Sequence, residues 1–168
     1  MKKFLDAYGK DMEFCQIELN YFDYRFQDAK GKVELLNSLN IPIWVMEPVR
    51  GGQLASLSED AESKLSSLRP DEKIPAWSFR FLQSIEGVTM TLSGMSTLSQ
   101  AKENIATYEE NKPLTVEEMN VILKIADDMI DKTTVPWSCV GCRSCEEVCP
   151  QNIKIPDELT RFSAKMGH

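Results

Sequence analysis

Four closely spaced cysteines give this chain its clearest chemical signal. Cys139, Cys142, Cys145 and Cys149 are followed by Pro150 and read C-x2-C-x2-C-x3-C-P. Cysteine thiolates at this spacing hold iron–sulfur clusters, because two residues between thiolates let one tight loop present successive sulfurs to the corners of one cubane. The run therefore predicts a metal site, a [4Fe–4S] cluster, with these four cysteines as its ligands.

Other interpretations of the run fit its spacing less well. A structural zinc site usually takes two cysteine pairs separated by a dozen or more residues, whereas here the pairs overlap. Disulfides belong to oxidising compartments, and nothing else in the chain is typical of a secreted protein. The fourth ligand stays open, because in two-cluster ferredoxins the cysteine before the proline binds the other cluster. Cys149 or an external group would then complete this one, and the remote Cys15 is better explained as a small buried side chain.

Composition limits the function classes. The chain has 168 residues, with 42% hydrophobic and 27% charged residues, which suits one domain with a real core and a small appendage. A net charge of −7 argues against binding to nucleic acid or to an anionic membrane surface. No apolar run approaches the ~20 residues of a membrane helix, and the N-terminal residues lack a signal-peptide pattern. We expect a cytoplasmic protein, where a reducing compartment would also protect a cluster.

The elements that must position any site alternate between strand and helix. Apolar runs predict strands over 13–20, 41–46 and 88–94, and 3.6-residue periodicity predicts a helix over 32–40. Two further pairs, Thr97 with Gln100 and Thr115 with Glu118, have the pattern of capping boxes that open helices. The other expected elements are helices over 58–68 and 75–84, a linker over 133–137 and a short helix starting at 155.

This order of elements predicts an α/β fold made of parallel βα units. Three parallel strands leave two unpaired edges, and such edges are usually covered or continued. The chain therefore looks like part of something larger. We expect either a homo-oligomer or a complementary part of a larger fold as its partner, and light scattering over a range of concentrations tests the first.

Three further stretches follow one another along the chain. They are residues 14–21 (FCQIELNY), residues 45–52 (VMEPVRGG) and residues 92–96 (LSGMS), with QAKEN following at 100–104. In this order they resemble the aldo/keto reductase family. They are similar to strands six, seven and eight of the family's (β/α)8 barrel, and some members carry a ferredoxin-like C-terminal extension similar to 138–162. The resemblance implies a partial TIM barrel over 1–132, about strands 6–8 with their helices, and a small Cys-rich iron–sulfur segment over 133–168.

The resemblance also implies contacts to a nicotinamide dinucleotide. Gln16 matches the glutamine that hydrogen-bonds the carboxamide, and Met46 stands where many members have an aromatic that stacks on the nicotinamide ring. The loop that passes the pyrophosphate corresponds to Val49, Arg50, Gly51 and Gly52. The segment near the ribose or its 2′-phosphate corresponds to Gly94 and Ser96, and the adenine contacts to Gln100, Glu103 and Asn104. Gln100 replaces an arginine common in NADP-preferring members, so NAD and NADP both stay open.

The bare residues have plainer interpretations as well. Gly51 and Gly52 would serve an ordinary turn after a strand, Glu103 a solvated helix surface, and Gln16 a satisfied buried amide.

The family's catalytic tetrad has no counterpart here. Its Asp, Tyr, Lys and His lie on the first half of the barrel, and none of the tyrosines falls in the matching motif (Tyr8, Tyr21, Tyr24 and Tyr108). The one histidine is His168, at the last position. No catalytic residue is therefore assigned, and whether the chain is itself an enzyme stays open.

Three hypotheses on function follow. In the first, the chain is the C-terminal part of an NAD(P)-linked oxidoreductase with one 4Fe–4S site, inactive without the other barrel half, which NAD(P) binding would also need. In the second, it is an iron–sulfur module for electron transfer or scaffolding, with a redox partner. In the third, it is an inert truncated remnant that self-associates. No membrane or nucleic-acid partner is expected.

Overall fold

The computed structural model describes residues 1–132, 139 and 142–165. The chain forms two compact units, Met1–Asp128 and Met129–His168, which are described separately below. The division falls four residues before the predicted boundary at 132. The predicted linker over 133–137 and His168 lie outside the described residues, and the assignment of functions to the two units stays a prediction.

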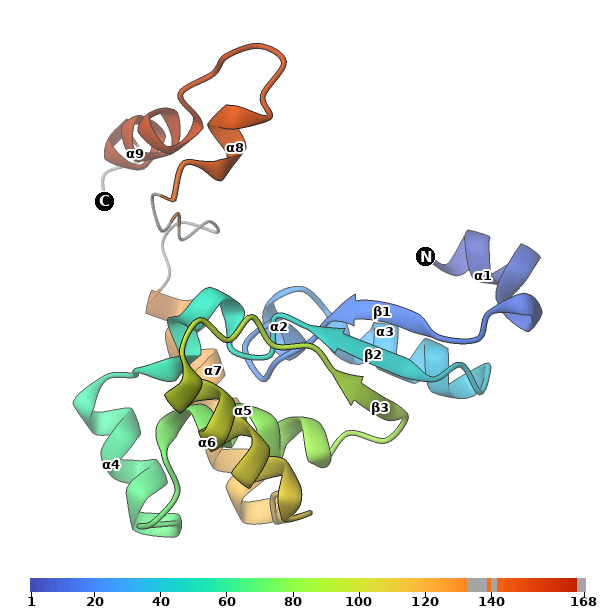
Figure 1. Ribbon diagram of the computed structural model, residues 1–168, viewed down its shortest axis with the longest axis vertical. Coiled ribbons are helices and arrows are strands. Elements are labelled where there is room, and N and C mark those ends of the chain that lie inside the picture. Colours follow the sequence, from blue (N-terminus) through green and yellow to red (C-terminus); the bar gives the residue numbers. More distant parts are fainter. Residues whose placement is uncertain (133–138, 140–141, 166–168) are drawn as a thin grey trace. The chain divides into compact units, whose positions relative to one another are not determined.

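A three-stranded parallel sheet organises the first unit (Figure 1). The strands are β1 (Cys15–Glu18), β2 (Ile43–Met46) and β3 (Val88–Thr91), in the order β1-β2-β3. Cys15 lies opposite Ile43, and a register shift between Ile43 and Trp44 precedes the pairing of Trp44 with Met90. The three predicted strands and their parallel arrangement are thus confirmed, each shorter than predicted.

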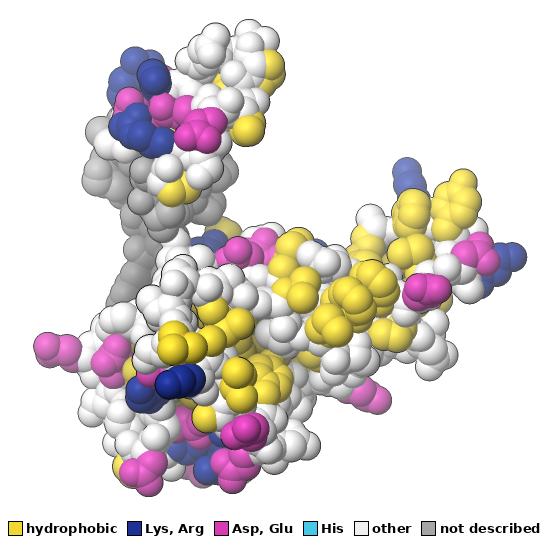
Figure 2. All heavy atoms as spheres, viewed as in Figure 1, with side chains coloured by type: hydrophobic (Ala, Val, Ile, Leu, Met, Phe, Trp, Pro, Cys, Tyr) yellow, Lys and Arg dark blue, Asp and Glu magenta, His cyan; other side chains and the backbone are white. Residues whose placement is uncertain are grey.

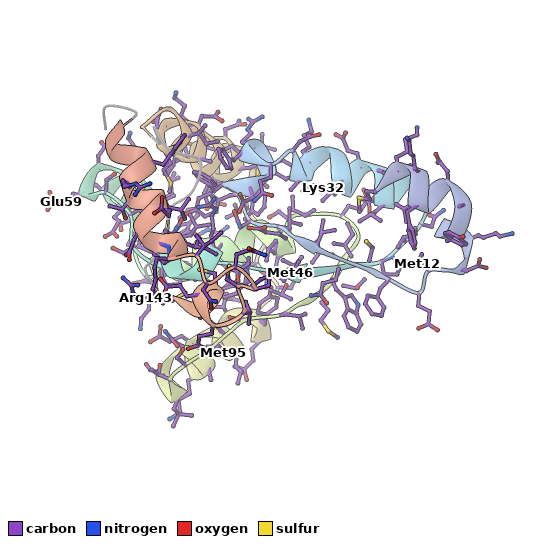
Figure 3. All side chains as sticks on the ribbon, turned by 90° about the horizontal axis from the view of Figure 1, so that it is seen from above. Met12, Lys32, Met46, Glu59, Met95 and Arg143 are labelled. Atoms are coloured by element: carbon purple, nitrogen blue, oxygen red, sulfur yellow. The ribbon has the colours of Figure 1, made fainter. Side chains whose placement is uncertain are left out.

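Helices follow each strand, as the βα pattern predicts. After β1 come α2 (Asp23–Phe26) and α3 (Ala29–Ser38), and after β2 come η2 (Arg50–Ala55), α4 (Glu59–Leu68) and α5 (Ile74–Gln83). After β3 come α6 (Leu98–Glu109) and α7 (Val116–Lys132), while α1 (Lys2–Tyr8) and η1 (Gly9–Asp11) precede the sheet. α3, which carries Lys32, lies along one side of the strands (Figure 3).

The two predicted capping boxes are both present. Thr97 Oγ1 accepts from the Gln100 amide, and the Gln100 side chain accepts from the Thr97 amide in return. Thr115 and Glu118 make the same reciprocal pair at the start of α7. Each pair satisfies amides that the first helical turn leaves without intrahelical partners.

The core of this unit lies between one sheet face and the helices. Ile17, Ile43 and Val45 point to it from the strands and are at most 6% exposed. The largest helical side chains in it are Trp77, Phe79 and Phe81 of α5, a helix most of whose residues are buried. The alternate strand residues, including Trp44, Met46 and Met90, therefore face the other side of the sheet.

Hydrophobic side chains gather on that other side of the strands (Figure 2). The Phe14 and Trp44 rings stack there with their centroids 3.7 Å apart, and Met46 and Met90 are 39% and 43% exposed. In a closed barrel this face would be the interior, which would explain its apolar side chains. The described strands alone leave those side chains partly exposed.

The second unit contains two further helices, α8 (Ser144–Glu147) and α9 (Ile155–Lys165). The short final helix predicted from residue 155 is confirmed. Arg143 ties the segment together, because its guanidinium bonds Glu146 at 2.7 Å and Asp157 at 2.9 Å. No helix in the described part of the chain is long and apolar enough to cross a membrane.

Candidate functional site: a cavity at the ends of two strands

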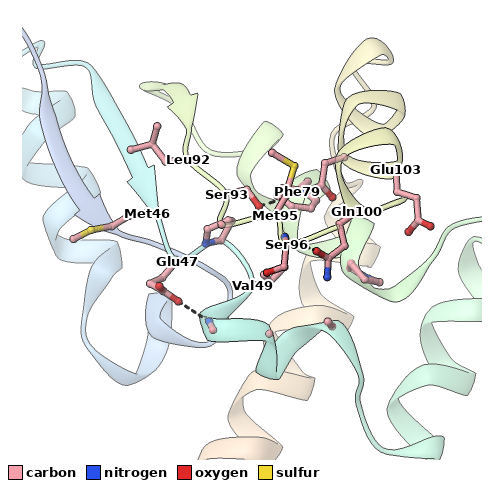
Figure 4. Close-up of a pocket in the computed structure, with 17 residues that line it drawn as sticks. Met46, Glu47, Val49, Phe79, Leu92, Ser93, Met95, Ser96, Gln100 and Glu103 are labelled. Atoms are coloured by element: carbon pink, nitrogen blue, oxygen red, sulfur yellow. Dashed lines mark hydrogen bonds between the residues drawn. The ribbon is translucent and has the colours of Figure 1, made fainter. Parts of the chain in front are cut away.

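A cavity of about 600 Å³ lies beyond the carboxyl ends of β2 and β3 (Figure 4). Ligand sites of parallel α/β sheets form at this end of the strands. The segment after β2, the segment after β3 and the starts of α5 and α6 supply its walls. The lining residues are Met46, Glu47, Pro48, Val49, Gly51, Gly52, Ala55, Pro75, Phe79, Leu92, Ser93, Gly94, Met95, Ser96, Gln100, Glu103 and Asn104.

All the predicted nucleotide contacts line this cavity except Gln16 and Arg50. Gln16 lies on β1 next to it, and its Nε2 contacts the Met46 sulfur at 3.4 Å. Segments about 50 residues apart in sequence, at Gly51 and at Asn104, are thus brought to one cavity. Which ligand they contact stays a prediction.

The Arg50 side chain points elsewhere. Its Nε lies 3.0 Å from the carboxylate of Asp23, which is fully buried, and its guanidinium carbon lies 4.4 Å from the centroid of the Phe22 ring. Nη1 bonds the Gln53 side chain at 2.5 Å. Arg50 therefore fastens the loop after β2 to the segment after β1, and its guanidinium is held by partners within the chain.

A buried polar cluster supports this end of β1. Asn20 and Asp23 are both fully buried, and Asn20 Nδ2 bonds the Asp23 carboxylate at 2.8 Å. Burial, followed by the charge of Asp23, raises the pKa of the nearby Glu18 carboxyl. Sequence reasoning missed this cluster, although the polar residues directly after an apolar strand were its available signal.

Gln100 and Asn104 of α6 already have partners within the chain. The side-chain oxygen of Gln100 accepts a hydrogen bond from the Ser96 backbone amide at 2.8 Å, so the helix cap already uses this oxygen. Asn104 Nδ2 bonds the Ser93 hydroxyl at 3.3 Å across the cavity wall. These contacts fix the shape of the wall on which the predicted ribose and adenine contacts lie.

The charged side chains lining the cavity are both acidic, Glu47 and Glu103. Glu103 accepts from Lys73 Nζ at 2.8 Å and from the Ser99 hydroxyl at 3.0 Å. The hydrogen bond from Lys73 lowers the pKa of this carboxyl below its usual range. Glu47 was not predicted as a site residue, although it lies inside the motif that gave its neighbours.

The four predicted cluster ligands belong to the second unit. Cys139 and Cys142 are exposed, Cys145 and Cys149 half-buried, and none is in a disulfide. Hydrogen bonds from the Ser144 backbone and hydroxyl lower the pKa of the Cys142 thiol, with Oγ 3.6 Å from the sulfur. The donor set suits iron in its chemistry. In the part of the chain that the structure describes, no three histidine, cysteine or acidic side chains are gathered to hold a metal ion.

Comparisons with solved structures identify the fold. The structure is similar to the aldo-keto reductase AKR11C1 from Bacillus halodurans in its holo form, with a TM-score of 0.57 and 23% identity over 73% of this chain and 44% of that one. The apo form of the same protein gives a TM-score of 0.56 and 23% identity over 73% of this chain and 47% of that one. The thermostable aldo-keto reductase Tm1743 in complex with the inhibitor epalrestat gives a TM-score of 0.52 and 20% identity over 66% of this chain and 38% of that one.

Sequence comparisons add nothing to this likeness, because no family model matches the chain and no curated protein does. The chain spans less than half the length of each of these solved structures. The three parallel strands, their helices and the structural likeness together show that the chain has the fold of part of an aldo-keto reductase barrel.

Proposed function

We propose that this chain is the C-terminal part of an NAD(P)-linked oxidoreductase of the aldo-keto reductase type, and that its cavity holds the adenine-nucleotide portion of the cofactor. One observation carries the proposal. Nine of the eleven residues that the sequence assigned to the dinucleotide, all but Gln16 and Arg50, come from two separate segments and line one cavity at the carboxyl ends of β2 and β3. The nicotinamide would supply hydride chemistry, while these residues would bind and orient the nucleotide.

The partner in this proposal is a set of further parallel βα units. Within the described residues, β1 and β3 each pair only with β2, so one edge of each has no strand beside it. Next to the β3 edge, α6 exposes Leu98, Ile105 and Tyr108 at 71%, 58% and 42%, at helical spacing on one face. A strand pairing with β3 and a helix packing on α6 would cover both surfaces, and reductase activity would require them. A second copy of the chain is the alternative source of such units.

Titration with AMP, followed by amide chemical shifts of the full chain, tests the nucleotide site. We expect weak binding, because part of the site's contacts would come from the other units, with shifts concentrated at Gly94, Ser96, Glu103 and Asn104. Replacing Gly94 with leucine should weaken this binding at least about tenfold. A Cβ at Gly94 meets no atom within 4 Å and Gly94 lines the cavity, so we expect the larger side chain to narrow the cavity and to leave the fold intact.

The matched control is Gly94→Ala, which adds one methyl group in the same open space and should leave binding within about twofold of wild type. AMP shifts outside the cavity, or equal binding by the leucine variant, would contradict the nucleotide site.

The second candidate function is an iron–sulfur module for electron transfer or scaffolding, with a redox partner. The cysteine spacing favours it, and the donor set of four cysteines is the one that [4Fe–4S] clusters use. The chain's own contribution would be to bring the thiolates into one loop. In such a loop the Ser144 amide and hydroxyl would donate hydrogen bonds to the Cys142 sulfur, as they do in the described residues.

Iron and acid-labile sulfide in protein purified without oxygen test this site. We expect about four of each per chain, with a broad absorption band near ~400 nm, and a loss of most of both in Cys145→Ala. Cys15→Ala is the matched control and should keep its cluster, because Cys15 lies on β1 and outside the C-x2-C-x2-C-x3-C-P run. Zinc in place of iron, or equal iron in the two variants, would reject the assignment. A cluster with no reversible reduction would leave only a structural role.

A further inference from the structure

The loop after β2 has an unusual backbone, which fixes where its amides and side chains point. Glu47, Arg50, Gly51 and Gly52 all have positive φ angles, of 58°, 49°, 60° and 91°. For the two residues with side chains this left-handed conformation costs free energy and needs support. The Glu47 carbonyl receives that support from the buried Asn20, whose Nδ2 donates to it at 2.9 Å.

The hydrogen bonds of this loop leave little for a ligand. The amide of Arg50 donates to the Glu47 carbonyl at 3.0 Å, and the amides of Gly52 and Leu54 both donate to the Val49 carbonyl, at 3.0 and 3.1 Å. The Gly51 amide differs, because its acceptor is a side chain, Oε2 of Glu47, at 2.5 Å (Figure 4). Of these four amides, only that of Gly51 has an acceptor that a side-chain rotation would remove.

The Glu47 carboxylate takes the place that an oxygen of an anionic ligand would take. Backbone amides in turns with left-handed residues bind phosphate and carboxylate oxygens alike. The carboxylate is exposed, lines the cavity and brings a negative charge to the Gly51 amide. Two basic side chains of the adjoining segments, Arg50 and Lys73, are paired with Asp23 and Glu103. Each of these cations is thus already paired with a carboxylate other than that of Glu47.

We propose that Glu47 is an internal anion that occupies the Gly51 amide and selects against ligands that bring a negatively charged oxygen to this loop. The inference rests on the proposed function in taking the cavity as a nucleotide site, and it sets the Glu47 carboxylate against the pyrophosphate contact that the family resemblance implies at Gly51. A phosphate oxygen must displace the carboxylate to reach the amide, and a displaced carboxylate still repels it. The cavity should therefore discriminate among nucleotides by the charge that they place at Gly51, while neutral groups are unaffected.

Binding of inorganic pyrophosphate, compared between the wild type and Glu47→Gln, tests the proposal. Glutamine keeps the length and the hydrogen-bonding oxygen but removes the charge. We expect the variant to bind pyrophosphate at least about tenfold more tightly, and the gain to shrink as salt is raised. Adenosine, which carries no charge, should bind both proteins equally. The matched control is Glu109→Gln, since Glu109 is an exposed acidic residue of α6 that does not line the cavity.

A second variant provides a readout that needs no ligand. In Glu47→Ala the Gly51 amide proton loses a short, charge-assisted bond and should move upfield in the free protein. Equal or weaker pyrophosphate binding by Glu47→Gln, or no pyrophosphate binding by either protein, would overturn the proposal and leave Glu47 as a brace of the loop. A separate result, the absence of AMP binding at the cavity of the wild-type protein, would reject the proposed function. The two failures are thus distinguishable.

Discussion

Replacing Arg80 with methionine is expected to destabilise the protein by about 3–5 kcal/mol, because the substitution strips a buried cation from several acceptors. The Arg80 side chain is only 3% exposed. Its guanidinium bonds Glu72 at 3.1 Å and the Thr107 and Glu110 carbonyls, at 2.7 and 2.5 Å, so it joins α5 to the last turn of α6. Methionine has a similar volume but no donors, and it would leave a carboxylate and two carbonyls without this partner.

Urea unfolding followed by tryptophan fluorescence measures this loss, with Trp77 as a buried reporter in the same helix. Arg25→Met is the matched control. Arg25 pairs with Asp127 at 3.5 Å, and the two side chains are 42% and 44% exposed. Its replacement should cost less than about 1 kcal/mol. Similar losses of unfolding free energy in the two variants would mean that the burial of Arg80 does not determine how much it stabilises the protein.

Protonation of Glu118 should destabilise the protein at acid pH. Arg69 holds the Glu118 carboxylate with bonds of 2.5 and 2.6 Å, and the Thr115 amide donates to it as well. The hydrogen bonds from Arg69 lower the pKa of this carboxyl from 4.5 to about 2. A lowered folded-state pKa stabilises the fold above pH 4.5, and that contribution falls away as the pH drops toward 2. It amounts to about 2–3 kcal/mol for one buried group of this kind.

The measurement is the free energy of unfolding at about pH 7, 5, 4 and 3 for the wild type and Glu118→Gln. The variant should be less stable at neutral pH, and the difference between the two proteins should narrow below pH 4.5. Glu34→Gln is the control, because Glu34 is 66% exposed and pairs with Lys30 at only 3.7 Å. A difference between wild type and Glu118→Gln that stays constant over the whole range would contradict the linkage.

Local signals predicted most of the secondary structure. The apolar run ending at Met46 gave β2, and the two capping boxes gave the starts of α6 and α7, because both signals are complete within a few residues. The strand ends were less accurate. Pairing with a neighbour decides where a strand stops, and β1 accordingly ends at Glu18 and not at residue 20.

The candidate site was predictable in its residues but not in its side-chain directions. Motif positions gave the segments that meet at the cavity, yet Arg50 turns to Asp23, 27 residues before it in the chain. The Glu47 contact with Gly51 depends on a left-handed backbone at a residue that has a side chain, which no local propensity favours. α1 and the buried cluster around Asn20 were missed, because their periodicity or polarity resembles that of an ordinary surface.

The spatial order of the strands equals their order in the sequence, which has a consequence for how the chain folds during its synthesis. Each strand can pair with the one made just before it, so every new βα unit closes only a short loop onto a surface that already exists. Folding can then proceed from the first strand toward the last as the chain leaves the ribosome. When its own unit is complete, β3 still has one edge without a described strand, as β1 has had since its own synthesis.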